Sequence, residues 1–178
     1  MLTLASRSPQ RKAILEQLGI EFRVAPADVE ELTEGDPRHV VVENAVRKAR
    51  AVEGDRVLGA DTEVFLDGRI FGKAADERQA RSFLTALSGR VHEVWGGIAL
   101  REGDEVRTAH AVTKVTFADL SEDLLGWYLE SEEWRDRAGA YAIQGLGSIL
   151  VAGLQGDFSN VVGLPITLLL QLAPNLLE

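Results

Sequence analysis

Cysteine is absent from this 178-residue sequence, so disulfide bonds and thiolate metal sites are excluded. Proline occurs only five times, and no Pro/Gly/Ser-rich tract separates one part of the chain from another. A basic excess is also lacking. The 19 Lys and Arg residues face 28 acidic ones, a net charge of −9, which argues against a general nucleic-acid binder because such binding depends on neutralising phosphates.

Long apolar runs are missing too. The longest one, near the C-terminus, is interrupted by Gly163, Pro165 and Gln171 and is shorter than the ~20 residues that a membrane helix needs. The N-terminal segment 1–5 lacks the basic region of a signal peptide, so we expect a cytoplasmic protein without a membrane anchor. The apolar content of 46% can bury a sizeable core, and the length predicts a single domain over residues 1–178.

The apolar periodicity and the turn residues predict alternating helices and strands. Helices are expected where Ser8-Pro9, Asp36-Pro37 and Asp76 offer capping residues, and Asp67-Gly68 is a strong hairpin signal. The pattern predicts a mixed twisted sheet with helices on its faces, in the α/β class. The predicted strands are 2–5, 22–25, 57–66, 69–71, 91–100, 105–117, 140–144 and 148–154, and the predicted helices follow Pro9, Asp36, Asp76, Ser121 and Pro165.

The segment 57–62 is an apolar run interrupted by a carboxylate, Asp61. It predicts a buried strand that presents one acid at its end, where α/β proteins commonly place their chemistry. An isolated aspartate at this position would more simply cap the following turn. Its combination with a polar loop after the first strand and with Gly72-Lys73 after the hairpin instead indicates a phosphate and metal site.

The polar loop between the first strand and the first helix contains hydroxyl and guanidinium groups at a helix N-terminus, which favours an anion. Its candidate phosphate-binding residues are Ser6, Arg7, Ser8, Gln10 and Arg11. Ordinary capping by Ser8 with solvated arginines is the alternative. The spaced glycines and the Gly-Lys-Ser/Thr ending of a P-loop are absent.

Further candidates lie elsewhere in the chain. Glu30 or Glu31 could join Asp61 on a hard cation such as Mg²⁺, which prefers oxygen ligands. Lys73 and Arg137 are suited to hold phosphates. Because a side-chain amide both donates and accepts hydrogen bonds, Gln144 is a candidate reader of a nucleobase edge.

Five blocks in this order resemble the motifs of the Maf family of nucleoside triphosphate pyrophosphatases. They are Leu4-Ala5-Ser6-Arg7-Ser8-Pro9-Gln10-Arg11, Gly59-Ala60-Asp61-Thr62, Gly72-Lys73, Ala138-Gly139-Ala140-Tyr141-Ala142-Ile143-Gln144-Gly145 and Val162-Gly163-Leu164-Pro165. The resemblance implies an elongated α/β fold similar to inosine triphosphate pyrophosphatases, with two lobes around a cleft and often a homodimer. It also implies metal-dependent cleavage of a nucleoside triphosphate into the monophosphate and pyrophosphate.

Within that family, Asp61-Thr62 together with Ile143-Gln144-Gly145 is similar to the branch that acts on dTTP and UTP. By this resemblance Asp61 is the proton acceptor, and Gln10, Thr62 and Gln144 occupy positions tied to substrate choice. The chain departs from the branch in three places. Gln10 stands where that branch usually has arginine, and Arg137 stands where lysine is common. Ala74 stands where proline usually follows the Gly-Lys pair.

The resulting hypothesis is that Mg²⁺ or Mn²⁺, held by Asp61 and Glu31, accompanies the triphosphate while Asp61 accepts a proton from the attacking water. Four cations drawn from separate parts of the chain would hold the phosphates: Arg11, Lys48, Lys73 and Arg137. The alternative is a nucleotide-binding regulator of cell division or septum formation without significant turnover. A phosphatase with Asp61 as nucleophile is disfavoured, because Glu63 occupies the place where such enzymes usually have a second aspartate.

Overall fold

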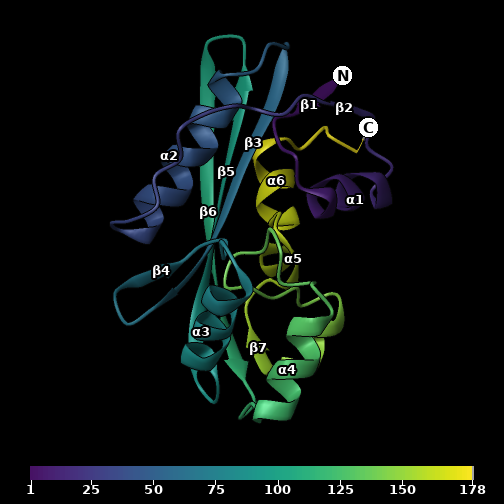
Figure 1. Cartoon of the computed structure of the whole chain (residues 1–178). Coiled ribbons are helices and arrows are strands. Elements are labelled where there is room, and N and C mark those ends of the chain that lie inside the picture. The colour runs from purple at the N-terminus through teal and green to yellow at the C-terminus, as the bar shows by residue number, and fades with distance from the viewer. Residues whose placement is uncertain (178) are drawn as a thin grey trace.

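A seven-stranded mixed sheet forms the centre of the protein. In the computed structural model, which describes residues 1–177, the strand order is β2-β1-β3-β5-β6-β7, and β4 pairs with β3 outside this path. The long strands β3 (Arg56–Leu66), β5 (Val91–Glu102) and β6 (Glu105–Phe117) run through both halves of the molecule (Figure 1). Strand β1 (Leu2–Leu4) is parallel to β3 and to β2 (Phe22–Val24), while the other pairings are antiparallel.

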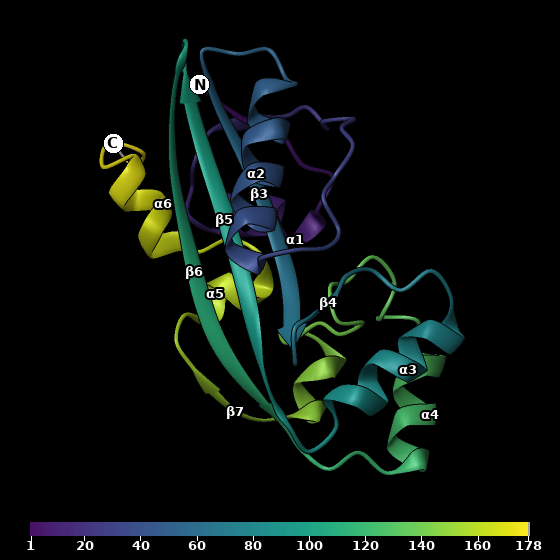
Figure 2. The ribbon, with the colours of Figure 1, turned by 90° about the vertical axis from the view of Figure 1, so that its left-hand side faces the viewer.

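One lobe packs helices on both faces of the sheet. Helix α2 (Pro37–Arg50) covers one face, and α1 (Pro9–Gln17) and α6 (Ile166–Leu172) lie on the other (Figures 1 and 2). Each face has its own apolar cluster. Alanines of α2 pack on Val57, whereas α1 and α6 cover Leu58 and its neighbours.

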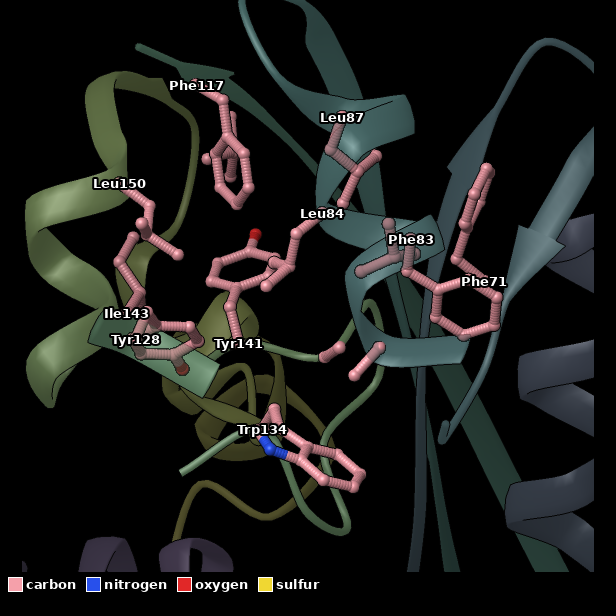
Figure 3. Close-up of a cluster of buried hydrophobic side chains, with 14 of the residues drawn as sticks. Phe71, Phe83, Leu84, Leu87, Phe117, Tyr128, Trp134, Tyr141, Ile143 and Leu150 are labelled. Atoms are coloured by element: carbon pink, nitrogen blue, oxygen red, sulfur yellow. The ribbon is translucent and has the colours of Figure 1, made fainter. Parts of the chain in front are cut away.

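The second lobe surrounds an aromatic cluster. Its elements are β4 (Arg69–Phe71), α3 (Glu77–Leu87), α4 (Glu122–Glu130), the 3-10 helix η1 (Leu146–Leu150) and β7 (Val151–Gln155), with α5 (Phe158–Val162) following. The aromatic cluster, as the name is used below, consists of Phe71, Phe83, Phe117, Tyr128, Trp134 and Tyr141 (Figure 3). All six side chains are buried, so this lobe has a core of its own.

Most predicted elements are confirmed, and the predicted capping residues explain why. Ser8, Asp36, Asp76 and Ser121 each accept a hydrogen bond from the backbone N–H three residues further on, which fixes the start of α1, α2, α3 and α4. The Asp67-Gly68 turn has positive φ at both residues, as a tight hairpin requires. The mixed α/β class with two lobes is therefore confirmed.

Two late strands were predicted incorrectly. Residues 140–144 form turns rather than a strand, because their apolar side chains are buried beside the aromatic cluster and the N–H of Ala142 donates to the Tyr128 hydroxyl at 3.2 Å. The predicted strand 148–154 begins only at Val151, after η1. Helix α5 was not predicted as a separate element.

Among residues 1–177, no helix is both long enough and apolar enough to cross a membrane.

Candidate active site

The middle of β3 is where the two lobes meet, and one of its edges is open there. Pairing with β1 ends where Leu4 lies opposite Leu58, and pairing with β4 begins only at Val64. Within the described part of the chain, no strand pairs with residues 59–63 on this edge, although all of them pair with β5 on the other. The sequence interpretation that Asp61 ends its strand is wrong. The neighbouring strand ends instead, and this leaves Asp61 at an open edge.

Asp61 is buried and bonded to two side chains of α2. Its Oδ1 accepts from the Lys48 ammonium at 2.9 Å, and its Oδ2 accepts from the Asn44 amide at 2.9 Å. Lys48 also donates to Glu31 Oε2 at 2.9 Å, so that one ammonium bridges two carboxylates. Asp61 and Lys48 expose only 7% and 10% of their side chains, and buried charges of this kind need such pairing.

The loop before α2 presents Glu31, and not Glu30, to the Lys48 ammonium that is bonded to Asp61. The side chain of Glu31 reaches Lys48, whereas Glu30 contributes its carbonyl oxygen to Arg47 at 3.0 Å. Asn44 ties the same loop to the helix, because its amide bonds both backbone groups of Leu32 at 2.7 and 2.9 Å. Asn44 was missed from the sequence, although its spacing of four residues from Lys48 places both on one face of a helix.

Close packing of α2 on the strand brings these groups together. Gly59 lies against the helix so tightly that a Cβ atom there would come within 2.0 Å of the Ala45 carbonyl oxygen. Only glycine permits this approach. The glycine of the motif therefore allows Asn44 and Lys48 to reach Asp61.

Arg11 reaches the site from the opposite face of the sheet. Its guanidinium donates to Ser6 Oγ at 3.1 Å, to Thr62 Oγ1 at 3.0 Å and to the Gly163 carbonyl at 2.8 Å. Burial lowers the pKa of Arg11, and the negative charge of Asp61 acts in the opposite direction. Arg11 is thus buried and positioned, in contrast to the alternative of solvated arginines.

Glu63 is a third acid at this edge, and the sequence reasoning gave it no role in the site. It lies two residues after Asp61, so alternation along β3 places both side chains on the same face. Its Oε2 atom is buried without a hydrogen-bond partner. Burial, with the charges of Asp61 and Glu31, raises the pKa of Glu63 to about 8.

Lys73 and Arg137 belong to segments that lie side by side. An isolated β-bridge joins Lys73 to Ala138, and the charge of Lys73 acts on Glu63. Lys73 is exposed, while Arg137 is half-buried with its Nε lacking a partner. Lys73 thus lies close to the acids of the open edge, and Arg137 is in the segment that pairs with it.

The other predicted residues divide into bonded and exposed ones. Ser8 caps α1 as the capping alternative predicted, and its hydroxyl also donates to Gln10 Oε1 at 3.1 Å. Ser6 is buried and accepts from the Ser8 N–H as well as from Arg11. The side chains of Arg7 and Gln144 are exposed.

Comparison with known proteins identifies the family. The family model described as "Maf-like protein" matches residues 1–176. The chain belongs to the Maf family. The membership predicted from five motifs is therefore confirmed.

Several curated proteins are similar to this chain over most of their length. A dTTP/UTP pyrophosphatase of Symbiobacterium thermophilum is 48% identical over 171 residues, which cover 93% of this chain and 88% of that protein. One of Pyrococcus furiosus is 44% identical over 177 residues, 96% of this chain and 93% of that protein. Among solved structures, the Ham1 protein of Staphylococcus aureus is 16% identical with a TM-score of 0.48, covering 66% of this chain and 72% of that one.

Proposed function

We propose that this protein is a nucleoside triphosphate pyrophosphatase that hydrolyses dTTP and UTP to the monophosphate and pyrophosphate. The observation that carries the proposal is the buried carboxylate of Asp61 at an open strand edge, with Lys48 bonded to it and Arg11 beside it. The proposal is supported by the activity that gives the similar Maf proteins their name.

Asp61 is the proposed proton acceptor. A carboxylate has about four acceptor positions, and the bonds from Lys48 and Asn44 use two of them. A water molecule bonded to a remaining position attacks the α-phosphorus and transfers its proton to Asp61. The bond between the α-phosphorus and the bridging oxygen breaks, and pyrophosphate leaves with that oxygen.

The proposed phosphate-binding groups are Arg11, Lys48, Lys73 and Arg137. The exposed loop residue Arg7, and Ser6 and Ser8 near the start of α1, support them. Phosphoryl transfer depends mainly on positioning and charge stabilisation. The three nitrogens of Arg11 are fixed by Ser6, Thr62 and Gly163, so this guanidinium is held in place before the substrate arrives. Cations that are already in position stabilise the negative charge that develops on the leaving pyrophosphate.

A divalent cation, Mg²⁺ or Mn²⁺, is part of the proposal, with Asp61 and Glu31 as its protein ligands. The site fits such an ion because the donors are carboxylate oxygens and because Glu63 Oε2 is a buried oxygen without a partner. Within residues 1–177 no three His, Cys, Asp or Glu side chains form a complete metal cage, but Mg²⁺ commonly uses one or two carboxylates plus substrate phosphates. When bound, the ion would neutralise charge on the phosphates.

Base selection is assigned to Gln10, Thr62 and Gln144. Thr62 is held by Arg11, and Gln144 has an exposed amide at a turn.

We also propose that the protein acts in the cytoplasm as a homodimer. Light scattering during gel filtration would test the dimer, for which the expected mass is near twice 19.4 kDa.

The direct test is release of pyrophosphate from UTP and dTTP with added Mg²⁺. The proposal requires turnover and one pyrophosphate per monophosphate formed. A nucleotide-binding regulator would bind the same nucleotides without turnover, and a phosphatase would release single phosphates. Omission of the metal, with EDTA, should abolish turnover.

A further inference from the structure

The turn that carries Gln144 is bonded from both sides by one acidic residue and one tyrosine. Glu133, which follows α4, accepts the N–H of Leu146 on Oε1 at 2.9 Å and the N–H of Gly147 on Oε2 at 2.8 Å. These donors lie just after Gln144 in the chain. A single carboxylate thus fixes the C-terminal side of the turn.

Tyr128 connects this carboxylate to the other side of the turn. Its hydroxyl donates to Glu133 Oε2 at 3.0 Å and accepts the N–H of Ala142 at 3.2 Å. The Gly145 N–H closes the turn on the Ala142 carbonyl at 3.1 Å. Tyr128 is fully buried in the aromatic cluster, so the connection has a rigid base (Figure 3).

The fit around the carboxylate is close. A Cβ atom at Gly145 would come within 1.9 Å of Glu133 Oε1. Any side chain at this position would therefore push the carboxylate away, and glycine avoids that clash. Glu133 and Tyr128 bond the backbone at 142, 146 and 147 and leave Gln144 exposed between these points. The contacts therefore fix the backbone while the amide stays available to a ligand.

We infer that Glu133 and Tyr128 are positioning residues for base recognition, holding the Gln144 amide where it distinguishes uracil from cytosine. The inference rests on the proposed function, in which Gln144 contacts the base. Uracil presents an N–H donor and carbonyl acceptors where cytosine presents an acceptor and an amino group. An amide in fixed orientation matches one pattern, whereas an amide on a mobile turn can adapt to both.

The test compares Glu133→Gln with Tyr128→Phe. In Glu133→Gln, the amide places an NH₂ group against a backbone N–H donor in either of its two orientations. Tyr128→Phe removes only the hydroxyl that joins Glu133 to the N–H of Ala142. Glu132→Gln is the matched control, since the Glu132 side chain is exposed and bonds Arg135 at 2.8 Å rather than the Gln144 turn. Gln144→Ala gives the discrimination that remains without the amide.

Two readouts are needed, the ratio of kcat/KM for UTP over CTP and the ratio of Kd for their non-hydrolysable α,β-methylene analogues. Loss of one well-placed hydrogen bond changes a ratio by about tenfold. We expect Glu133→Gln and Tyr128→Phe to lower both ratios toward that of Gln144→Ala, with kcat for UTP changed less, and Glu132→Gln to match the wild type.

Each other outcome has a defined meaning. Unchanged ratios in both variants, an equal loss on UTP and CTP, or a wild-type protein that binds both analogues alike would overturn the inference. If the wild type releases no pyrophosphate while the Kd ratios shift as expected, the proposed function fails and the positioning role stands. If Tyr128→Phe does not fold, Glu133→Gln decides.

Discussion

The aromatic cluster and the charged groups around Asp61 are both buried, but they differ in how their members are satisfied. In the aromatic cluster, rings pack edge to face, as Phe117 and Tyr141 do at 4.8 Å between centroids. Around Asp61, three acids lie close to the cations Lys48 and Arg11, and Glu63 keeps a buried oxygen without a partner. Burial in the first region stabilises the fold, whereas burial in the second leaves groups available to a charged ligand.

The largest expected effect is on stability, in the aromatic cluster. Trp134 is 1% exposed and donates to the Leu129 carbonyl at 3.1 Å, so Trp134→Ala should lower the free energy of unfolding by about 3–5 kcal/mol. Trp127→Ala is the control, because Trp127 is 48% exposed and should cost much less. Urea unfolding measures both. A cost below about 1 kcal/mol at Trp134 would contradict this account of the core.

At Arg11 the expected loss is of activity rather than of stability. Arg11→Lys keeps the charge but cannot reproduce three directed bonds to Ser6, Thr62 and Gly163, so kcat/KM for UTP should fall about 10–100-fold. The exposed neighbour Lys12, changed to Met, should keep wild-type activity. Equal activity of Arg11→Lys and wild type would show that the fixed fork has no role in catalysis.

The smallest expected effect is a pH dependence at Glu63. With its pKa raised from 4.5 to about 8, the folded protein keeps a proton that the unfolded chain loses above about pH 4.5. Stability should therefore fall as pH rises toward 8 and level off above it. Glu63→Gln stays neutral, so its Tm advantage over wild type in EDTA should grow by at least about 2 °C between pH 5.5 and pH 8.5.

The control for that measurement is the exposed Glu34, changed to Gln, which should keep the wild-type dependence. A constant difference between Glu63→Gln and wild type across this pH range would mean that Glu63 is ionised in the folded protein throughout.

The contrast between the regions also explains what the sequence could predict. Local signals such as Ser8-Pro9 and Asp36-Pro37 act within one turn of chain, so the helix starts followed from them directly. Residues 140–144 have an apolar pattern typical of a strand. Their backbone groups instead find a side-chain partner in Tyr128, a contact between distant residues that no local pattern encodes.

The same distinction applies to the candidate site. Asp61, Arg11 and Lys48 stood out by motif or by charge, and the structure brings them together. Glu63 and Asn44 were missed, although strand alternation and helical spacing each supplied a signal. Glu133 could not be found in this way, because its role depends on how the chain after α4 folds back against the Gln144 turn.

The most direct measurement of the central claim, that the charged groups around Asp61 form the catalytic centre, is pyrophosphate release from UTP by Asp61→Asn with Mg²⁺ present. Asparagine retains the shape and an acceptor for Lys48 but cannot take a proton. The account predicts a loss of at least about 100-fold in kcat with the fold retained by circular dichroism. A folded Asp61→Asn variant that keeps more than about one hundredth of the wild-type rate would contradict it.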